Sequence, residues 1–209
     1  MPFLRPISDR YFEDYVEGDV HLFGTIAVEA DQIIAFANQF DPQTLHTDPE
    51  AAKSGPFAGL IASGWHTAGL MTRLFMDHYL TKVASLGSPG GDELRWVKPV
   101  RPGDTLSVRV TVLKAVPSKS KPDRGAVTSF VEVINQASEI VMTFKVVNII
   151  AKRLPESRNH SCDMRGEVPR SAFGREQSRI VSTRPSEIPH QAMRTPIVSS
   201  HGSGREFRA

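Results

Sequence analysis

Asp41 and His46, five positions apart, are the residues of this chain whose types and spacing best suit acid–base chemistry. An imidazole has an unperturbed pKa close to neutrality, and partial burial raises the pKa of a carboxylate, so both groups can exchange protons with a substrate. Five helical steps of about 100° put two side chains roughly 140° apart, so one regular helix cannot bring the pair together. Because Pro42 disfavours helical backbone at Asp41, we expect a loop to bring the two side chains together.

The same pair also fits a simpler role, in which the carboxylate stabilises a turn and the imidazole lies on the surface. The segment that follows, from Gly55 to Trp65, is rich in glycine and small residues. Within it, Ser63 and Gly64 come directly before an apolar stretch, where a serine often caps the start of a helix. The pair alone does not decide between the two roles.

Two helices are predicted, one on each side of this segment. From Ala30, apolar residues recur at i, i+3, i+4 and i+7, which predicts an amphipathic helix that ends near Asp41. A second helix is predicted from Gly64 to about Val83. Its first half is apolar nearly all the way round, so we expect it to be buried on most sides. Residues 49–53 predict a helical turn between the two.

The remaining segments predict β-strands. Residues 106–112 alternate apolar and polar side chains with a period of two. The other features predicted are strands at 20–28, 93–100, 126–134 and 140–150, a flexible turn at 88–91 and a hairpin at 135–139. Several antiparallel strands and one largely apolar helix pack most simply when the sheet curls around the helix, which is an α+β fold.

Composition and charge exclude several classes of function. The chain has 209 residues and 40% apolar content, enough for one substantial core. Residues 1–154 hold 8 Lys and 8 Arg against 17 acidic residues, a net charge of −1, so no broad basic surface for nucleic acid is expected. No apolar run reaches the roughly 18 residues that span a bilayer, and the N-terminus lacks a secretory segment. We therefore expect a cytoplasmic protein that binds neither nucleic acid nor membrane.

Neither a disulfide nor a metal site is predicted. The chain has one cysteine, Cys162, so no internal disulfide can form. Five histidines have no ligand spacing to a cysteine or to a cluster of acids: His21, His78, His160, His190 and His201. We expect no metal and no other cofactor.

The chain changes character after Leu154. Residues 155–209 hold five Pro, nine Ser and no hydrophobic periodicity, and their nine Arg against six acids give a net charge of +3. Such a segment cannot bury enough apolar surface to offset its chain entropy, which predicts a disordered tail after a domain of residues 1–154. A short Arg-rich binding segment within the tail is the alternative.

Three motifs follow one another along the chain: Asp41-Pro-Gln-Thr-Leu-His46, then Gly59-Leu-Ile-Ala-Ser-Gly64, then Lys98-Pro-Val-Arg-Pro-Gly-Asp-Thr105. In this order they resemble the MaoC-like dehydratase family, whose corresponding elements are Asp-x-Asn-Pro-x-His, Pro-Ile-Ala-His-Gly, and Pro-Val followed by Gly-Asp-Thr. The resemblance covers roughly residues 11–152. Gln43 and Thr44 replace the family's Asn-Pro, and Ser63 replaces its histidine.

The resemblance implies the hot-dog fold, in which an antiparallel sheet wraps around one long central helix. It also implies the activity of the (R)-specific enoyl-CoA hydratases, which is the reversible addition of water to a 2-enoyl thioester. The substrate would be an acyl-CoA or another acyl-thioester. The active form would be a homodimer, which would also cover an otherwise unpaired strand edge.

The resemblance assigns roles to several residues. Asp41 and His46 would hold the water between them, and the backbone N–H of Gly64 would stabilise charge on the thioester oxygen. The hydroxyl of Thr72 would help to hold the site. Four further residues would contact the substrate: Ser63, Trp65, Lys98 and Arg101. For the two basic residues among them, a solvated strand face is the alternative to contact with CoA phosphates.

Two other functions stay open at this point. A hot-dog thioesterase would use its carboxylate to activate water at the thioester carbonyl, and the Asp/His spacing argues against it. A non-catalytic acyl-CoA-binding subunit is compatible with the changes at Gln43, Thr44 and Ser63.

Overall fold

The computed structural model describes residues 3–154. Two 3₁₀ turns come first, η1 (Ile7–Asp9) and η2 (Phe12–Asp14), followed by β1 (Val20–Ala27) and helix α1 (Ala30–Phe40). Two one-turn helices, α2 (Thr44–Thr47) and α3 (Pro49–Ala52), lead to the long helix α4 (Gly64–His78). The strands β2 (Gly90–Trp96), β3 (Thr105–Pro117), β4 (Arg124–Ile134) and β5 (Ile140–Ala151) follow. The tail predicted to be disordered, 155–209, and Cys162, His160, His190 and His201 within it, lie outside the described residues.

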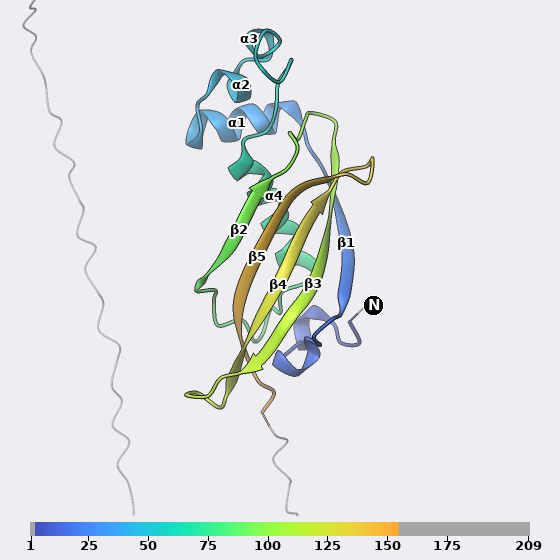
Figure 1. Cartoon of the computed structure of the whole chain (residues 1–209), viewed down its shortest axis with the longest axis vertical. Helices are drawn as coiled ribbons and strands as arrows, with labels where there is room; N and C mark the ends of the chain where they lie inside the picture. The colour runs from blue at the N-terminus through green and yellow to red at the C-terminus, as the bar shows by residue number, and fades with distance from the viewer. Residues whose placement is uncertain (1–2, 155–209) are drawn as a thin grey trace, which may run out of the picture. The chain divides into compact units, whose positions relative to one another are not determined.

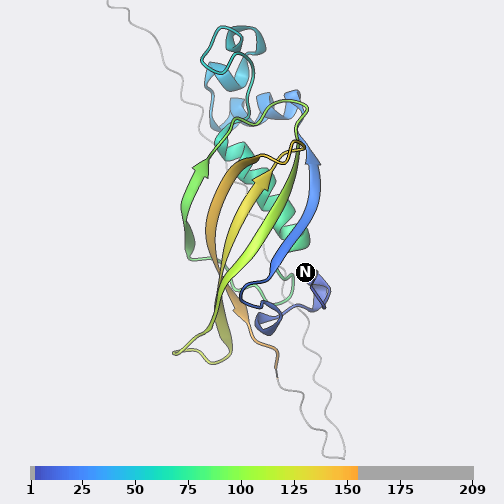
Figure 2. The same ribbon diagram turned by 45° about the vertical axis from the view of Figure 1, so that its right-hand side comes forward.

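The five strands form one antiparallel sheet in the order β1-β3-β4-β5-β2, so β1 and β2 are its edges. The sheet curls around α4, and the short helices α1, α2 and α3 gather at one end of it (Figures 1 and 2). A sheet wrapped in this way around one long helix is the hot-dog fold. The predicted α+β architecture is therefore confirmed.

Alternation of apolar residues along the strands closes the sheet over α4. In the first part of β3, every second residue is fully buried: Leu106, Val108, Val110 and Val112. Four residues of α4 belong to the same core: Leu70, Met71, Leu74 and Phe75. Each such side chain contributes about 1.5–3 kcal/mol when it is fully buried. The core therefore determines where α4 lies under the sheet.

Helix α4 is buried on one face only, whereas its first half was expected to be buried on most sides. The side chain of Trp65 is 59% exposed, and Gly69 and Thr72 on the same side are exposed too. The apolar composition of this half was misleading because one sheet covers only one side of the helix. The other side faces outward in the single chain.

Helix α4 also ends at His78, five residues before its predicted end. The N–H of Tyr79 closes the last bond, to the carbonyl of Phe75, and the chain then turns into the core. The hydroxyl of Thr81 accepts from the N–H of Ala84 and so stabilises this turn. The helix ends here because burial of Tyr79 and the hydrogen bonds of the turn stabilise the chain more than further helical residues would.

Strand β2 begins and ends earlier than predicted. It spans Gly90–Trp96 instead of 93–100, because Gly90 already pairs with Val147 of β5. Part of the predicted turn at 88–91 is thus strand. Proline has no N–H to donate to the ladder, so Pro99 and its neighbours form a loop. The predicted hairpin between β4 and β5 is confirmed, and β3 runs five residues beyond its predicted end at residue 112.

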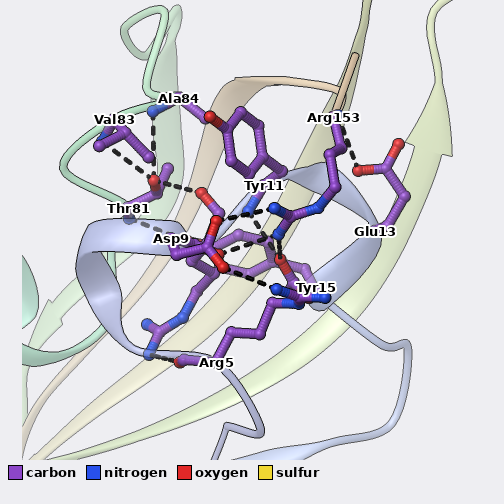
Figure 3. Close-up of polar contacts among 11 residues, drawn as sticks. Arg5, Asp9, Tyr11, Glu13, Tyr15, Thr81, Val83, Ala84 and Arg153 are labelled. Atoms are coloured by element: carbon purple, nitrogen blue, oxygen red, sulfur yellow. Dashed lines mark hydrogen bonds and ion pairs between the residues drawn. The ribbon is translucent and has the colours of Figure 1, made fainter. Parts of the chain in front are cut away.

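Arg153, just after β5, fastens the end of the sheet to the N-terminal segment (Figure 3). Its Nη1 donates to Oδ1 of Asp9 at 2.7 Å, and its Nη2 donates to Oδ2 of Asp14 at 3.2 Å. Its guanidinium also lies 4.4 Å from the centroid of the Tyr11 ring. Hydrogen bonds from Arg153 and Arg5 hold the pKa of Asp9 below its usual value.

Replacing Arg153 should weaken the contact between the end of β5 and the N-terminal segment. We expect Arg153→Ala to lower the midpoint of thermal unfolding, because two carboxylates and the Tyr11 ring lose a shared partner. Arg124→Ala is the matched control, since the side chain of Arg124 bonds to the adjacent Asp123. Equal midpoints for the two variants in a calorimetric scan would mean that the contacts of Arg153 with the N-terminal segment add no stability.

Candidate active site

Asp41 lies directly after the last residue of α1, and the end of this helix positions it. The N–H of Asp41 makes the last bond of α1, to the carbonyl of Ala37, and its backbone angles are no longer helical. Within three residues the chain begins α2, a single turn that carries His46. The sequence predicted a loop for both residues, so the helical turn around His46 is a correction. It forms because the N–H groups of His46 and Thr47 both find the carbonyl of Gln43.

His46 is held in one orientation and in one tautomer. The side chain is buried, and its Nδ1 lies 2.8 Å from the carbonyl oxygen of Ile61. A carbonyl can only accept, so Nδ1 carries the hydrogen and Nε2 presents a lone pair when the ring is neutral. This Nε2 lies 3.5 Å from Oδ2 of Asp41. The pair predicted from the sequence does converge.

The carboxylate of Asp41 receives two short hydrogen bonds. The amide Nε2 of Gln43 donates to Oδ1 at 2.7 Å, and the hydroxyl of Ser63 donates to Oδ2 at 2.6 Å. These donors, Gln43 first and Ser63 second, hold the pKa of Asp41 below its usual value of 3.8. From the sequence, burial was expected to raise this pKa. Burial does act in that direction, but the two hydrogen bonds outweigh it, so Asp41 is ionised at neutral pH.

Ser63 links Asp41 to the start of α4. It is fully buried, and its Oγ accepts from the N–H of Trp65 while donating to Asp41. It is therefore the N-cap of α4 and a partner of the carboxylate at once. Gly64, the next residue, is the first residue of α4. The first N–H groups of a helix have no partner within it, and the helix dipole favours negative charge there.

These groups line one cavity of about 440 Å³. Asp41 and His46 line it, and so does Gly64 at the start of α4. The remaining lining residues are mostly apolar and come from three segments: Gln43, Leu45, Phe57, Ile61, Ala62, Trp65, Thr67, Trp96, Val97, Lys98, Pro99 and Val100. The cavity can hold a small apolar chain with a polar group against the helix N-terminus.

Two predicted residues do not reach this cavity. Thr72 is exposed, and its hydroxyl donates to the carbonyl of Ala68 within α4. Eight residues separate it from Gly64, which is about 12 Å along a helix axis. Arg101 donates instead to the carbonyl of Phe57 at 2.6 Å, and this bond holds the loop before α4.

The other predicted residues lie at the site in different ways. Trp65 and Lys98 line the cavity, and Ser63 lies behind it. The ammonium of Lys98 pairs with Glu139 at 2.5 Å. Sequence reasoning missed Gln43 as a partner of Asp41, although its place two residues further on made this bond possible. The place of Trp96 in the cavity was not predicted either. Trp96 lies on an edge strand far along the chain from Asp41 and His46, and no sequence pattern near it indicates a role at the site.

Residues 3–154, which the structure describes, hold no group of three or more His, Cys, Asp or Glu arranged to bind a metal ion. No helix in this part of the chain is long and apolar enough to cross a membrane.

Comparison with known proteins shows the family of the chain. A model of the MaoC like domain matches residues 13–152, a range that contains every residue of the cavity. The chain belongs to the MaoC-like family. A solved MaoC-like dehydratase from Rhodospirillum rubrum is 41% identical to this MaoC-like chain, with a TM-score of 0.65, and the match covers 70% of this chain and 99% of that one.

Two further relatives are similar in sequence. The uncharacterized protein YdeM of Bacillus subtilis is 29% identical over 141 residues, which is 68% of this chain and 98% of YdeM. The (R)-specific enoyl-CoA hydratase of Rhodospirillum rubrum is 29% identical over 114 residues, which is 53% of this chain and 74% of that enzyme. The family predicted from the three motifs is confirmed.

The hydrogen bonds to Asp41 can be tested without any assay of activity. Ser63→Ala and Gln43→Ala should each raise the pKa of Asp41 toward 3.8, because each removes a donor that favours the ionised carboxylate. The pKa is measured by following the Asp41 side-chain carboxyl carbon in an NMR titration. Ser54→Ala is the control, since its hydroxyl bonds to the carbonyl of Ala51. If neither variant changes the titration, the two bonds do not control the charge of Asp41.

Proposed function

We propose that this MaoC-like protein catalyses the reversible addition of water to the double bond of a 2-enoyl thioester. The observation that carries the proposal is the convergence of an ionised Asp41 and a fixed His46 beside Gly64 at a helix N-terminus. The reaction needs an activated water, a proton donor for C2 and a donor to the thioester oxygen. The cavity supplies a candidate for each. A relative named as an (R)-specific enoyl-CoA hydratase supports the same reaction.

The water binds between Oδ2 of Asp41 and Nε2 of His46. Both atoms are acceptors, so the water donates one hydrogen to each and turns a lone pair toward the substrate. As its oxygen forms the bond to C3, one O–H bond breaks and its proton passes to Nε2 of His46. The nearby carboxylate stabilises the imidazolium that forms. His46 then returns the proton to C2, and dehydration follows the same steps in reverse.

The N–H of Gly64 stabilises the transition state. When water adds to C3, the electron pair of the double bond moves toward the thioester oxygen, which becomes negative. A free N–H at the start of α4 can donate to that oxygen, and one such donor is commonly worth about 3 kcal/mol. Acid–base groups and this donor suffice for the reaction, so the proposal includes no metal and no cofactor.

The substrate is an acyl-CoA or another acyl-thioester, and the apolar lining of the cavity accepts its acyl chain. Lys98, at the cavity, is the candidate partner for an anionic group of the carrier. The protein acts as a homodimer in the cytoplasm. Six of the seven residues of β2 are exposed at the edge of the sheet, and an exposed edge is a template for pairing with a second chain.

Removing either member of the pair should abolish most of the activity. We expect Asp41→Asn and His46→Ala to lower kcat/KM for crotonyl-CoA by about 10²–10⁴-fold, the usual contribution of general acid–base groups. Hydration is followed by the loss of enoyl absorbance. Asp31→Asn, an exposed change on α1, and His78→Ala, at the far end of α4, are matched controls that should keep the activity.

Other outcomes favour other functions. Full activity in both variants would rule out the mechanism above. Release of free thiol without hydration would identify a thioesterase, and binding of acyl-CoA without either reaction would identify a binding subunit.

A further inference from the structure

The indole of Trp96 lies directly against Gly64. A Cβ atom added at Gly64 would lie 2.6 Å from Nε1 and 2.8 Å from Cδ2 of that indole, closer than any real contact of this kind. The ring therefore occupies the place of a side chain at position 64. Only glycine lets it approach the first turn of α4 so closely.

Trp96 has a second aromatic neighbour at the same place. Its ring meets that of Trp65 edge to face, with centroids 5.4 Å apart and planes at 79°. Both indoles line the cavity that contains Asp41 and His46, and both are about half exposed. Two large apolar side chains thus stand at the start of α4, where a bound thioester would have to fit beside them.

The backbone on both sides of Trp96 is anchored. Trp96 ends β2 and pairs with Met142 of β5. The N–H groups of the next two residues, Val97 and Lys98, both donate to the carbonyl of Val141. The indole is therefore carried by a fixed backbone and has Gly64 on one side and Trp65 on another. It forms a wall of the cavity beside the N–H that receives the thioester oxygen.

We propose that Trp96 is a specificity-determining residue that admits 2-enoyl thioesters without a substituent on C2 and rejects those that carry a methyl group there. The proposal rests on the function proposed above. A thioester oxygen bonded to the N–H of Gly64 lies about 2.9 Å from its nitrogen, so C1 and C2 lie next to the indole that packs against the same residue. A methyl group on C2 then competes with the ring for the same space.

The kinetic test compares crotonyl-CoA with (E)-2-methylbut-2-enoyl-CoA. The ratio of their kcat/KM values, branched over unbranched, should rise at least about tenfold in Trp96→Leu, the effect of one methyl group in a hydrophobic pocket, and less in Trp96→Phe. Partial misfolding cancels from this ratio, because both substrates meet the same folded fraction. A ratio that stays at the wild-type value in both variants would overturn the proposal.

A binding test separates this proposal from the proposed function. The chain has two tryptophans, so Trp65→Phe leaves Trp96 as the sole tryptophan, whose emission can be excited selectively over that of the three tyrosines. Butanoyl-CoA, which cannot be hydrated, should change its emission saturably, and 2-methylbutanoyl-CoA should bind at least about tenfold more weakly. In Trp96→Leu, followed through Trp65, this difference should disappear.

The two tests distinguish an error in the proposed reaction from an error in the proposed role of Trp96. If the protein hydrates no enoyl thioester but shows this difference in binding, the proposed reaction is wrong and the role of Trp96 stands. If the two saturated thioesters bind equally well, or neither alters the emission of Trp96, the role of Trp96 is wrong whatever the reaction.

Discussion

The hydrogen bond from Ser63 to Asp41, 2.6 Å long and buried at the serine, is the interaction on which the site depends. It joins the end of α1 to the first turn of α4. Because the same hydroxyl accepts from the N–H of Trp65, the carboxylate has a defined place relative to the free N–H groups of the helix. Together with the larger effect of Gln43, the bond also lowers the pKa of Asp41. One hydroxyl thus positions the carboxylate and helps to keep it ionised.

The fold explains why the cavity with Asp41 and His46 lies at this end of α4. The sheet covers one face of the helix, and its far end is enclosed by the chain turn at Tyr79 and by the N-terminal segment that Arg153 fastens (Figure 1). The short helices α1 to α3 gather at the N-terminal end, and the cavity there is lined by α2, the loop before α4, the end of β2 and the loop after it. These short elements bring polar groups to a helix end that the long elements hold in place.

Local patterns in the sequence predicted the elements that depend on local packing. The alternation along β3 and the spacing along α1 lead directly to the observed strand and helix. The three motifs predicted the family and the meeting of Asp41 with His46. The lowered pKa of Asp41 could not be predicted, because it depends on where the donors of Gln43 and Ser63 point. The position of Trp96 depends on the register of β2 against β5, which no pattern near Gly64 contains.

The most direct test of the account is a crystal structure of the protein with bound butanoyl-CoA. The account predicts that the thioester oxygen lies about 2.9 Å from the nitrogen of Gly64, a normal hydrogen-bond distance. It also predicts that C3 faces the gap between Oδ2 of Asp41 and Nε2 of His46. A thioester oxygen bound away from Gly64, or an acyl chain that leaves C3 distant from this pair, would contradict it.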